Sequence, residues 1–405
     1  MITDHDILII GGGMVGASLA CALAGRDLRI AVIEAQIPPA TWPRDGTDLR
    51  VSALTRATQR IFGALGVWDR MVRQRVSPFR EMRVWDAAGP GAIHFDSAEI
   101  GEDTLGYIVE NRVIQAALWE HMAGFDTVEV IAPAAPAALT LDRDGARLRL
   151  EDGRELAARL VVGADGADSR LRAQAGLDAR QWDYHQKAVV ATVRTEKSHR
   201  ETAWQRFLPT GPLAFLPLSD GACSIVWSTT PEHADALLAL DEDAFRAELA
   251  QAVEHRLGRI ESAGPRAAFA LRMLYAPRYV QPRIALVGDA AHAIHPLAGQ
   301  GVNLGLLDAA ALAEVVLHAH AADRDIGALA TLRRYERWRK GDNLATMAVM
   351  DGFKRLFGSR LAPLRWARNV GLTLTDDLAP LKNLIMRRAM GLAGDLPPLA
   401  RGHVG

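Results

Sequence analysis

The residues best suited to binding chemistry near the N-terminus form a glycine-rich turn followed by an acid. Gly11, Gly13 and Gly16 follow an apolar run, and Glu34 ends the next apolar run. In a dinucleotide-binding turn the first glycine permits a tight bend, the second lets the backbone approach a pyrophosphate, and the third lets a helix pack on a strand. An acid at this spacing suits a ribose diol. The pattern predicts a nucleotide site.

The elements around this turn follow from the apolar pattern. Residues 6–10 and 28–34 read as buried strands, and the segment between them reads as a helix that closes near Gly25. Met14 and Val15 open that helix. Because the first amides of a helix have no internal acceptor, we expect these two residues to face the phosphates.

A second candidate site lies almost three hundred residues into the chain. A buried-strand pattern over 285–288 ends abruptly at Gly288 and Asp289, and the segment 299–305 is a glycine-rich turn that runs into a helix. Asp289 on its own could be a helix N-cap. Together with the turn that follows it, the carboxylate is better explained as a ligand contact at the end of a strand.

The remaining pattern divides into strands and helices. Residues 148–156 read as a hairpin because of their Asp-Gly turn, and 158–166 read as another buried strand that ends in glycine. Residues 82–96 and 182–269 read as mostly antiparallel strands, with a helix over 241–257. Everything after Val302 reads as helical, apart from a frayed tail.

Composition excludes several classes of protein. The 405 residues include 47 basic and 48 acidic side chains, a net charge of -1, so no strong field attracts nucleic acid. Cys21 and Cys223 are expected to be unpaired thiols. The N-terminus does not resemble a signal peptide, and no window approaches the ~18 apolar residues of a membrane span. These features predict a cytoplasmic protein of two or more domains.

Several stretches resemble one family over nearly the whole chain. They are LRVSAL at 49–54, LGYIVEN at 105–111, LVVGADGADSRLR at 160–172, AFLPLSD at 214–220 and GDAAHAIHPLAGQGVNLG at 288–305. Together they resemble the single-component FAD-dependent aromatic hydroxylases, and within them the ubiquinone-biosynthesis hydroxylases that act on polyprenylated phenols.

The resemblance implies an α/β fold of the p-hydroxybenzoate hydroxylase type. A Rossmann-like FAD-binding domain would be interrupted by a mostly antiparallel β-sheet substrate domain and followed by C-terminal helices. The expected boundaries are 1–75, 101–181 and 278–330 for the FAD-binding domain, 76–100 and 182–277 for the substrate domain, and 331–405 for the helical region.

The resemblance also implies roles for individual residues. Asp289 would accept hydrogen bonds from the ribityl chain of FAD, and Pro296 would lie beside the flavin ring. The candidate cofactor-binding residues are Gly11, Gly13, Met14, Val15, Gly16, Glu34, Arg50, Asn111, Asp165, Gly288, Asp289, Pro296, Gly299, Gly301, Val302 and Asn303. Arg50 could instead be a surface salt-bridge residue, and Asp165 could simply cap a turn. His292 and His295 lack a third ligand nearby, so no metal is expected.

The implied reaction is hydroxylation of an electron-rich ring, with NAD(P)H as a transient electron donor, O2 as oxygen source and FAD as the cofactor that carries the chemistry. No catalytic residue is assigned. Pro296 and Phe215 are pocket candidates, although the strand 214–218 could equally be ordinary core. The segment 381–392 could meet a membrane surface or a partner, or pack on its own domain.

Other readings of the function remain open at this point. A noncatalytic flavoprotein scaffold of a quinone-biosynthesis complex would carry the same cofactor motifs, as would a flavoenzyme acting on another aromatic or prenyl substrate. A homo-oligomer, a multiprotein complex and peripheral contact with the inner face of the cell membrane are further expectations.

Overall fold

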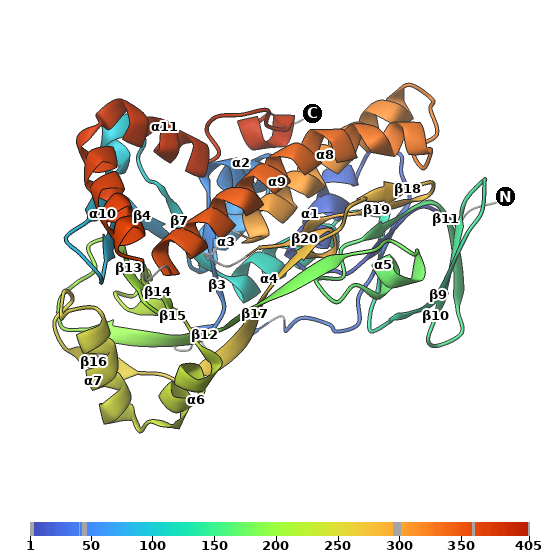
Figure 1. The fold of residues 1–405 in the computed structure, drawn as a ribbon. Helices are drawn as coiled ribbons and strands as arrows, with labels where there is room; N and C mark the ends of the chain where they lie inside the picture. Colours follow the sequence, from blue (N-terminus) through green and yellow to red (C-terminus); the bar gives the residue numbers. More distant parts are fainter. Residues whose placement is uncertain (1–3, 40, 43–46, 295–300, 359–360, 404–405) are drawn as a thin grey trace.

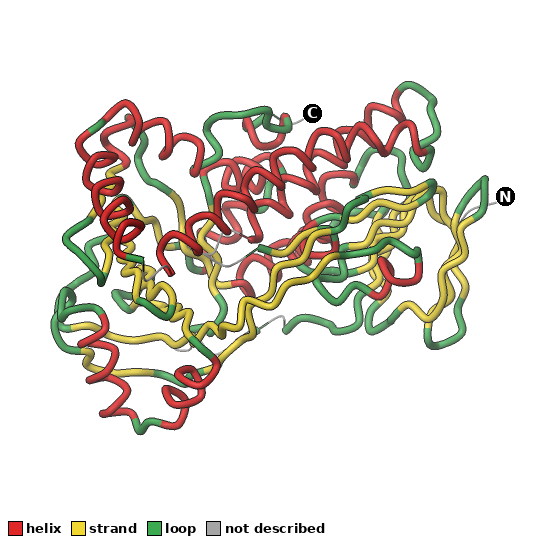
Figure 2. Tube along the Cα trace, viewed as in Figure 1, coloured by secondary structure: helices red, strands yellow, loops and turns green. Residues whose placement is uncertain are grey.

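Two large β-sheets lie side by side, with the longest helices packed along one edge of both (Figure 1). This computed structural model describes residues 4–39, 41–42, 47–294, 301–358 and 361–403. Colouring by secondary structure separates the strand-rich centre from the helices that cover it (Figure 2).

The first sheet is built from the predicted nucleotide-binding strands. Its parallel part has the order β19-β11-β1-β2-β8. The strands are β1 (His5–Ile10), β2 (Ile30–Ile33), β8 (Val128–Ile131), β11 (Glu155–Gly163) and β19 (Ile284–Leu286), extended by β18 (Val280–Gln281), β10 (Ala146–Leu150) and β9 (Pro136–Leu141). The predicted hairpin pairs β10 with the start of β11, and the predicted buried strand after it is the rest of the same strand, β11. Continuous apolar runs form these strands because helices cover the sheet.

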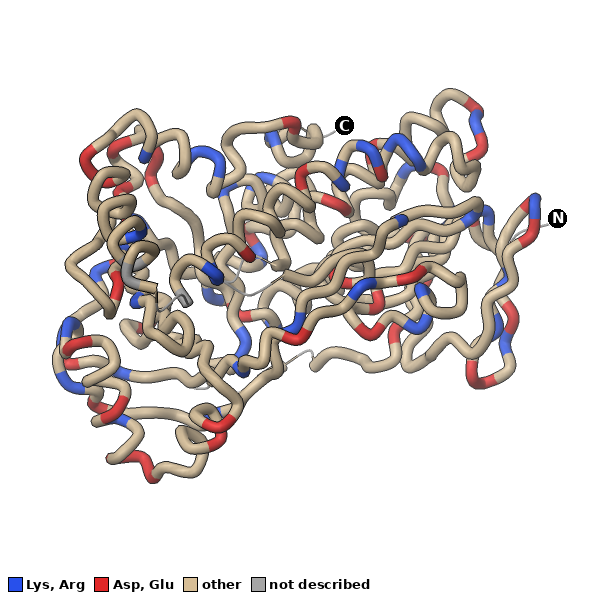
Figure 3. The backbone as a smooth tube through the Cα atoms, in the orientation of Figure 1, with Lys and Arg blue, Asp and Glu red and all other residues tan. Residues whose placement is uncertain are grey.

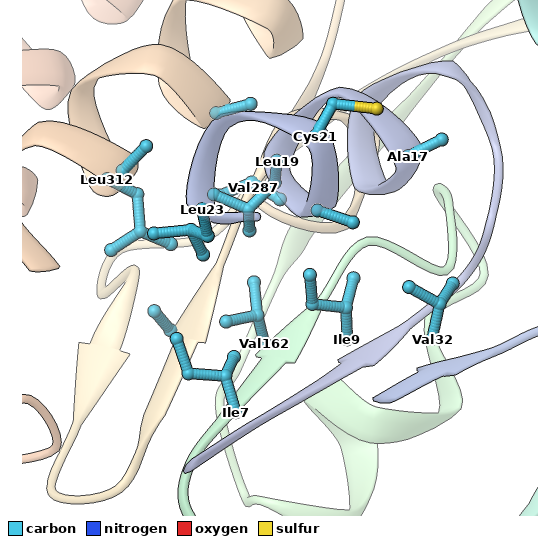
Figure 4. Close-up of a cluster of buried hydrophobic side chains, with 14 of the residues drawn as sticks. Ile7, Ile9, Ala17, Leu19, Cys21, Leu23, Val32, Val162, Val287 and Leu312 are labelled. Atoms are coloured by element: carbon cyan, nitrogen blue, oxygen red, sulfur yellow. The ribbon is translucent and has the colours of Figure 1, made fainter. Parts of the chain in front are cut away.

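Helix α1 (Met14–Leu23) packs across this sheet. Its apolar side chains meet those of β1 and β11 in the main core, where Ile7, Leu19 and Val162 are fully buried (Figure 4). Helix α4 (Asn111–Met122) and helix α8 (Gly301–Ala321) pack against α1. The first turns of α1 and α8 are therefore held close to the ends of the parallel strands.

The second sheet is mostly antiparallel and has the order β20-β17-β12-β15-β14-β13-β5-β6, with β16 paired to β12. Its strands are β5 (Glu81–Asp86), β6 (Ala92–Asp96), β12 (Arg180–Thr195), β13 (Thr202–Leu208), β14 (Gly211–Pro217), β15 (Cys223–Thr229), β16 (Ile260–Ala263), β17 (Ala267–Tyr275) and β20 (His292–Ala293). Helix α7 (Glu242–Ala252) matches the predicted helix, and α6 (Pro231–Ala239), which was not predicted, precedes it. Since β20 pairs with β17, residues 292–293 join this sheet. The proposed domain boundaries remain predictions.

A small third sheet has the strand order β3-β7-β4, and β5 and β6 of the second sheet fall between its strands in the sequence. It consists of β3 (Val51–Leu54), β4 (Ser77–Phe79) and β7 (Gly106–Glu110). The short helices α2 (Arg56–Ala64), α3 (Trp68–Gln74) and η1 (Ser97–Ile100) lie in the same part of the chain, whereas α5 (Arg170–Gln174) follows β11 and packs on β9. Helix α4 follows directly after β7, which places Asn111 at the edge of the small sheet.

The C-terminal region is helical, as predicted. It consists of α9 (Leu329–Gly358), α10 (Ala362–Asp377), α11 (Ala379–Ala389) and a final 3-10 turn, η4 (Pro398–Arg401). A buried ion pair between Arg368 Nε and Asp86 Oδ2, 2.6 Å apart, ties α10 to the β5–β6 hairpin. The prediction of a frayed tail is wrong for the described residues, because η4 packs on α2 and α8 and Ala400 is fully buried.

Helix α8 also corrects an expectation about membrane spans. This helix of 21 residues is long and apolar enough to cross a bilayer; an 18-residue window of it has a mean hydropathy of 1.5, and 78% of that window is buried inside the protein. A helix that is apolar all round is expected in the core of a large domain, so α8 is explained by its packing against α1 and α9. The positions of charged residues are spread along the chain in both halves of the molecule (Figure 3).

Candidate cofactor and substrate site

The turn between β1 and α1 can be made only with glycine at two positions. A Cβ on Gly16 would lie 1.9 Å from the carbonyl oxygen of Gly11, and one on Gly11 would lie 2.4 Å from that of Ala164. Gly11 also has φ +104°, which disfavours any side chain. Around Gly13, in contrast, a Cβ would meet nothing within 4 Å. The turn is thus packed tightly against the protein on one side. Its other side, at Gly13, is open, so a ligand could contact the protein backbone there.

Glu34 stands at the end of β2 and folds back toward this turn. Its Oε2 accepts a 2.6 Å hydrogen bond from the Gly12 amide, and its Oε1 accepts one of 3.0 Å from the Gln36 amide. A carboxylate oxygen can accept more than one hydrogen bond, so ribose hydroxyls could still be bound here. Glu34 therefore both stabilises the turn and remains a candidate ligand contact.

A cleft of about 640 Å³ opens between the two large sheets. It is within the usual size range of ligand pockets. The predicted cofactor residues that line it are Gly13, Met14, Val15, Arg50, Asn111, Asp289, Gly301 and Val302. They come from positions almost three hundred residues apart in the chain. Further lining residues that sequence reasoning missed include Gln181, Phe269 and Arg272.

Asp289 faces this cleft from the turn η2 (Gly288–Ala290). Its side chain is exposed and lines the cleft. Loss of solvation raises the pKa of this carboxyl above its ordinary value, although the positive charges of His292 and Arg50 oppose that shift. A carboxylate held in such a place has acceptor oxygens with few competing donors, which suits the binding of ligand hydroxyls.

Arg50 and Asn111 lie along the wall of the cleft formed by the small sheet. The guanidinium carbon of Arg50 lies 5.4 Å from the centre of the Phe269 ring, a cation–π geometry. The side chain of Asn111 accepts a 2.7 Å hydrogen bond from the Ser52 hydroxyl. Arg50 thus brings a positive charge near Asp289, as a site for an anionic ligand requires.

Asn303, a predicted cofactor residue, has protein partners that account for its side chain. The amide of Asn303 donates to Ala53 O and accepts from Thr55 N and Thr58 Oγ1, at 2.7–3.0 Å. Asn303 is 4% exposed, and its side chain does not line the cleft.

Asp165 caps the start of α5 instead of reaching into the cleft. It accepts hydrogen bonds from Ser169 Oγ at 2.6 Å and Leu171 N at 3.1 Å. This geometry favours the alternative that Asp165 caps a turn. Pro296, Gly299 and His295 lie outside the described residues.

A second, apolar cavity of about 110 Å³ lies beside this cleft, on the same face of β14. Apolar side chains dominate its walls. They include Ala53, Phe79, Met82, Phe95, Leu105, Ile108, Ala203, Ala214, Leu216, Ile385, Met386, Ala389 and Met390. Leu216 also lines the cofactor cleft, so the two spaces meet at this side chain.

Phe215 points away from both spaces. It is fully buried in a different core, with Val189, Ile225 and Trp227, on the opposite face of the sheet. Successive side chains of a strand alternate between faces, which places Ala214 and Leu216 on the cavity side instead. The strand 214–218 does line the cavity, but Phe215 is the wrong residue of that strand.

Sequence reasoning also missed a buried polar network behind η2. Asp308 of α8, His292 of β20, and Arg339 and Asn343 of α9 are 0–2% exposed and hydrogen-bonded to one another. An acid within the otherwise apolar helix 301–321 was the available signal, because a charge in such a place requires buried partners.

The described residues contain no group of three or more His, Cys, Asp or Glu side chains that could hold a metal ion. His292 is instead engaged with Asp308. Both cysteines are buried and free, and loss of solvation raises the pKa of each thiol to about 12. Neither thiol is suited to reaction at neutral pH.

The arrangement fits a flavin dinucleotide. The open side of Gly13 and the first turn of α1, which no side chain caps, can receive phosphate oxygens. Asp289 can accept from ribityl hydroxyls, and the first turn of α8 at Gly301 brings the positive end of a helix dipole to the cleft. Gly13, Asp289 and Gly301 line the same cleft of about 640 Å³.

Comparison with known proteins also indicates an FAD-binding protein. A model of the FAD binding domain matches residues 4–340. The chain is 42% identical to ubiquinone hydroxylase UbiL of Rhodospirillum rubrum over 98% of its length and 92% of the relative's. It is 39% identical to 3-demethoxyubiquinol 3-hydroxylase of Escherichia coli, over 96% of this chain and 98% of the other.

Among solved structures, p-nitrophenol 4-monooxygenase PnpA of Pseudomonas putida shares the fold. The TM-score is 0.77 at 19% identity, and the match covers 96% of this chain and 99% of that one. The predicted p-hydroxybenzoate hydroxylase type of fold is therefore confirmed. The chain belongs to the FAD-binding-domain family of flavoprotein monooxygenases, in the group that contains the ubiquinone-biosynthesis hydroxylases.

Proposed function

We propose that this protein hydroxylates the aromatic ring of a polyprenylated phenol or quinol in ubiquinone biosynthesis, with FAD as cofactor, NAD(P)H as electron donor and O2 as oxygen source. The relatives named for ubiquinone hydroxylation match the chain over nearly its full length. When bound, FAD supplies the redox and oxygen chemistry, so the protein has to bind, orient and shield.

The observation that carries this proposal is the junction of two unlike spaces at Leu216. The cleft, which carries the charged and polar groups, would accommodate the nucleotide, and the apolar cavity beside it has the lining that an isoprenoid chain needs. Burying each CH2 group of such a chain contributes about 0.8 kcal/mol. A substrate with a ring at the cleft and its tail in the cavity would use both.

The residues between the two spaces would orient the ring and exclude water. Leu216 and Val226 give the cleft an apolar wall on the substrate side, where the second sheet meets it. An apolar wall keeps solvent from the reacting groups and holds the ring in one orientation. No side chain is assigned as an acid or base, in keeping with chemistry that resides in the cofactor and the electron-rich ring.

The direct test is NAD(P)H oxidation by the FAD-loaded protein with a prenylated phenol. We expect the phenol to stimulate oxidation and the product to gain one oxygen atom, measured by mass spectrometry with ¹⁸O2. Full FAD occupancy without turnover of any prenylated phenol or quinol would favour the noncatalytic scaffold. Equal turnover of ring compounds that lack a prenyl chain would favour a different aromatic substrate.

We further propose that the protein works in the cytoplasm and contacts the inner face of the cell membrane through α10 and α11. Along these helices Trp366 is 70% exposed, Leu384 59% and Leu374 52%, and Ile385 belongs both to this face and to the cavity wall. The exposed Arg387 and Arg388 lie on the same part of α11. Apolar and basic side chains together are typical of helices that lie on anionic bilayers.

Flotation with vesicles that contain anionic lipid tests this contact. We expect the protein to float with such vesicles and the double variant Trp366→Ser, Leu384→Ser to float less, with FAD retained. If this variant instead changes the size of the particle in solution while flotation is unaltered, α10 and α11 form a contact with another subunit or a partner of a larger complex.

A further inference from the structure

The carboxylate of Asp308 holds the turn that carries Asp289 at both of its ends. Its Oδ2 accepts a 3.2 Å hydrogen bond from the Gly288 amide and also pairs with Nε2 of His292 at 2.5 Å. Gly288 comes directly before Asp289, and His292 follows three residues after it. One buried oxygen atom therefore closes the five-residue turn 288–292.

The other oxygen of the same carboxylate is held from α9. Oδ1 accepts from Arg339 Nε at 3.0 Å and from Asn343 Nδ2 at 3.1 Å. Asn343 in turn contacts His292 Nε2 at 2.8 Å and accepts from Arg339 through its Oδ1 at 2.9 Å. Helix α9 thus fixes the position of Asp308, and Asp308 fixes the turn.

The charges around Asp308 keep it ionised. Burial alone would raise its pKa, but the charge and hydrogen bond of His292 and the charge of Arg339 outweigh burial and hold the pKa of Asp308 below its usual value. Asp289 lies within reach of the same charges: His292 lowers its pKa and Asp308 raises it. The network therefore sets both the place and the electrostatic surroundings of Asp289.

The turn has little other freedom. A Cβ added to Gly288 would lie 3.2 Å from Val15 Cγ2, and one added to Gly305 would lie 2.7 Å from the same atom and 3.0 Å from the Gly288 Cα. The turn is held between α1 and α8, with Asp308 one helical turn further along α8. A shift of Asp308 would consequently be transmitted to Asp289.

We propose that Asp308 is a positioning residue for FAD binding, which acts by locking the 288–292 turn so that Asp289 faces the cleft. It touches neither the cleft nor a ligand bound there. This role differs from plain stabilisation of the core, because it predicts that Asp308 acts on the cofactor only through Asp289. It concerns cofactor binding alone and holds whatever the ring substrate is.

A double-mutant cycle on FAD affinity separates the two roles. Asp308→Asn, Asp289→Asn and the double variant are purified as apoproteins, and the Kd for FAD is measured by quenching of flavin fluorescence. We expect Asp308→Asn alone to weaken FAD binding roughly tenfold, a coupling in the range measured for contacting residues. On the Asp289→Asn background the same change should weaken binding less than about twofold. Equal effects on both backgrounds would overturn the proposal.

Two further variants guard against misfolding and nonspecific effects. His292→Ala frees one end of the turn while Asp308 stays paired with Arg339, and should show the same dependence on Asp289. His292→Gln, which keeps a donor, should restore most of the affinity.

The matched control is Asp325→Asn, which removes an acid paired with Arg283 at 2.7 Å elsewhere in the same half. It should lower the melting temperature of the apoprotein without coupling to Asp289. If His292→Ala and Asp325→Asn change FAD affinity alike, the network is merely structural and the proposal is wrong.

Discussion

The cofactor cleft and the apolar cavity meet at Leu216 but are built in opposite ways. The cleft combines strand ends, glycine turns and the first turns of α1 and α8 with the polar side chains of Arg50, Asn111 and Asp289 and an apolar wall from the second sheet. The cavity is formed by side chains of β14, the small sheet and α11, and its walls are almost entirely apolar. The cleft would recognise its ligand by hydrogen bonds at fixed points, whereas the cavity would recognise its ligand by shape.

This difference predicts different sensitivities to mutation. In the cleft, each part of the ligand has few polar partners. Removing one of them should therefore weaken binding strongly. In the cavity, many small contacts add up, so a change matters mainly when it alters the available volume.

The largest effect is expected for Asp289→Ala, which removes the carboxylate at the centre of the cleft. The protein should fold and lose FAD affinity by about 1.5–3 kcal/mol, the value of a charged hydrogen bond, or roughly 10- to 150-fold in Kd. Gel filtration followed by the flavin absorbance of the protein peak measures the loss. Retention of one yellow flavin per chain would contradict the assignment, and Asp144→Ala, on an exposed turn, is the control.

An intermediate effect is expected at the cavity. Ala214→Leu adds bulk to the cavity wall and should raise KM for a long-tailed phenol while leaving a phenol with one isoprene unit almost unaffected. The matched control is Phe215→Leu on the opposite face of β14, which should lower the melting temperature and affect both substrates alike. Loss of activity on both substrates in Ala214→Leu would place the tail elsewhere.

The smallest effect concerns the stability of the apoprotein at different pH. Because burial raises the pKa of Asp289 in the fold, its ionisation opposes folding at every pH above that raised pKa. Asp289→Asn has no charge to bury, so the variant apoprotein should melt slightly higher than the parent at pH 8. The difference should shrink as the pH falls through the raised pKa. Scanning calorimetry without FAD checks this, and a difference that grows toward acid pH would show that the sign is wrong.

The cofactor half could be predicted because its signals are local in sequence. Gly11, Gly16 and Glu34 sit in one strand-turn-helix-strand unit, and the structure explains each glycine by a contact within that unit or with the neighbouring strand end. Asn303 and Asp165 show the limit of motif reasoning. Their positions in the motif are right, but hydrogen bonds to other protein groups occupy their side chains.

The cavity and the Asp308 network could not be predicted in the same way. The strand 214–218 is apolar at every position because both of its faces are buried, so its pattern does not reveal which side chains face the cavity. Asp308 and Arg339 lie 31 residues apart on different helices, and only the packing of α8 on α9 brings them together. An acid in the middle of a mostly apolar helix indicates a buried partner but not its identity.

The shared wall at Leu216 has one more consequence. Because Leu216 is the one described residue that lines both the head and the tail compartment, the depth to which a prenyl chain is inserted would determine which ring carbon is presented to the cofactor. Regiochemistry in such a protein could then be retuned by trimming or enlarging one residue of β14, with the nucleotide cradle left untouched.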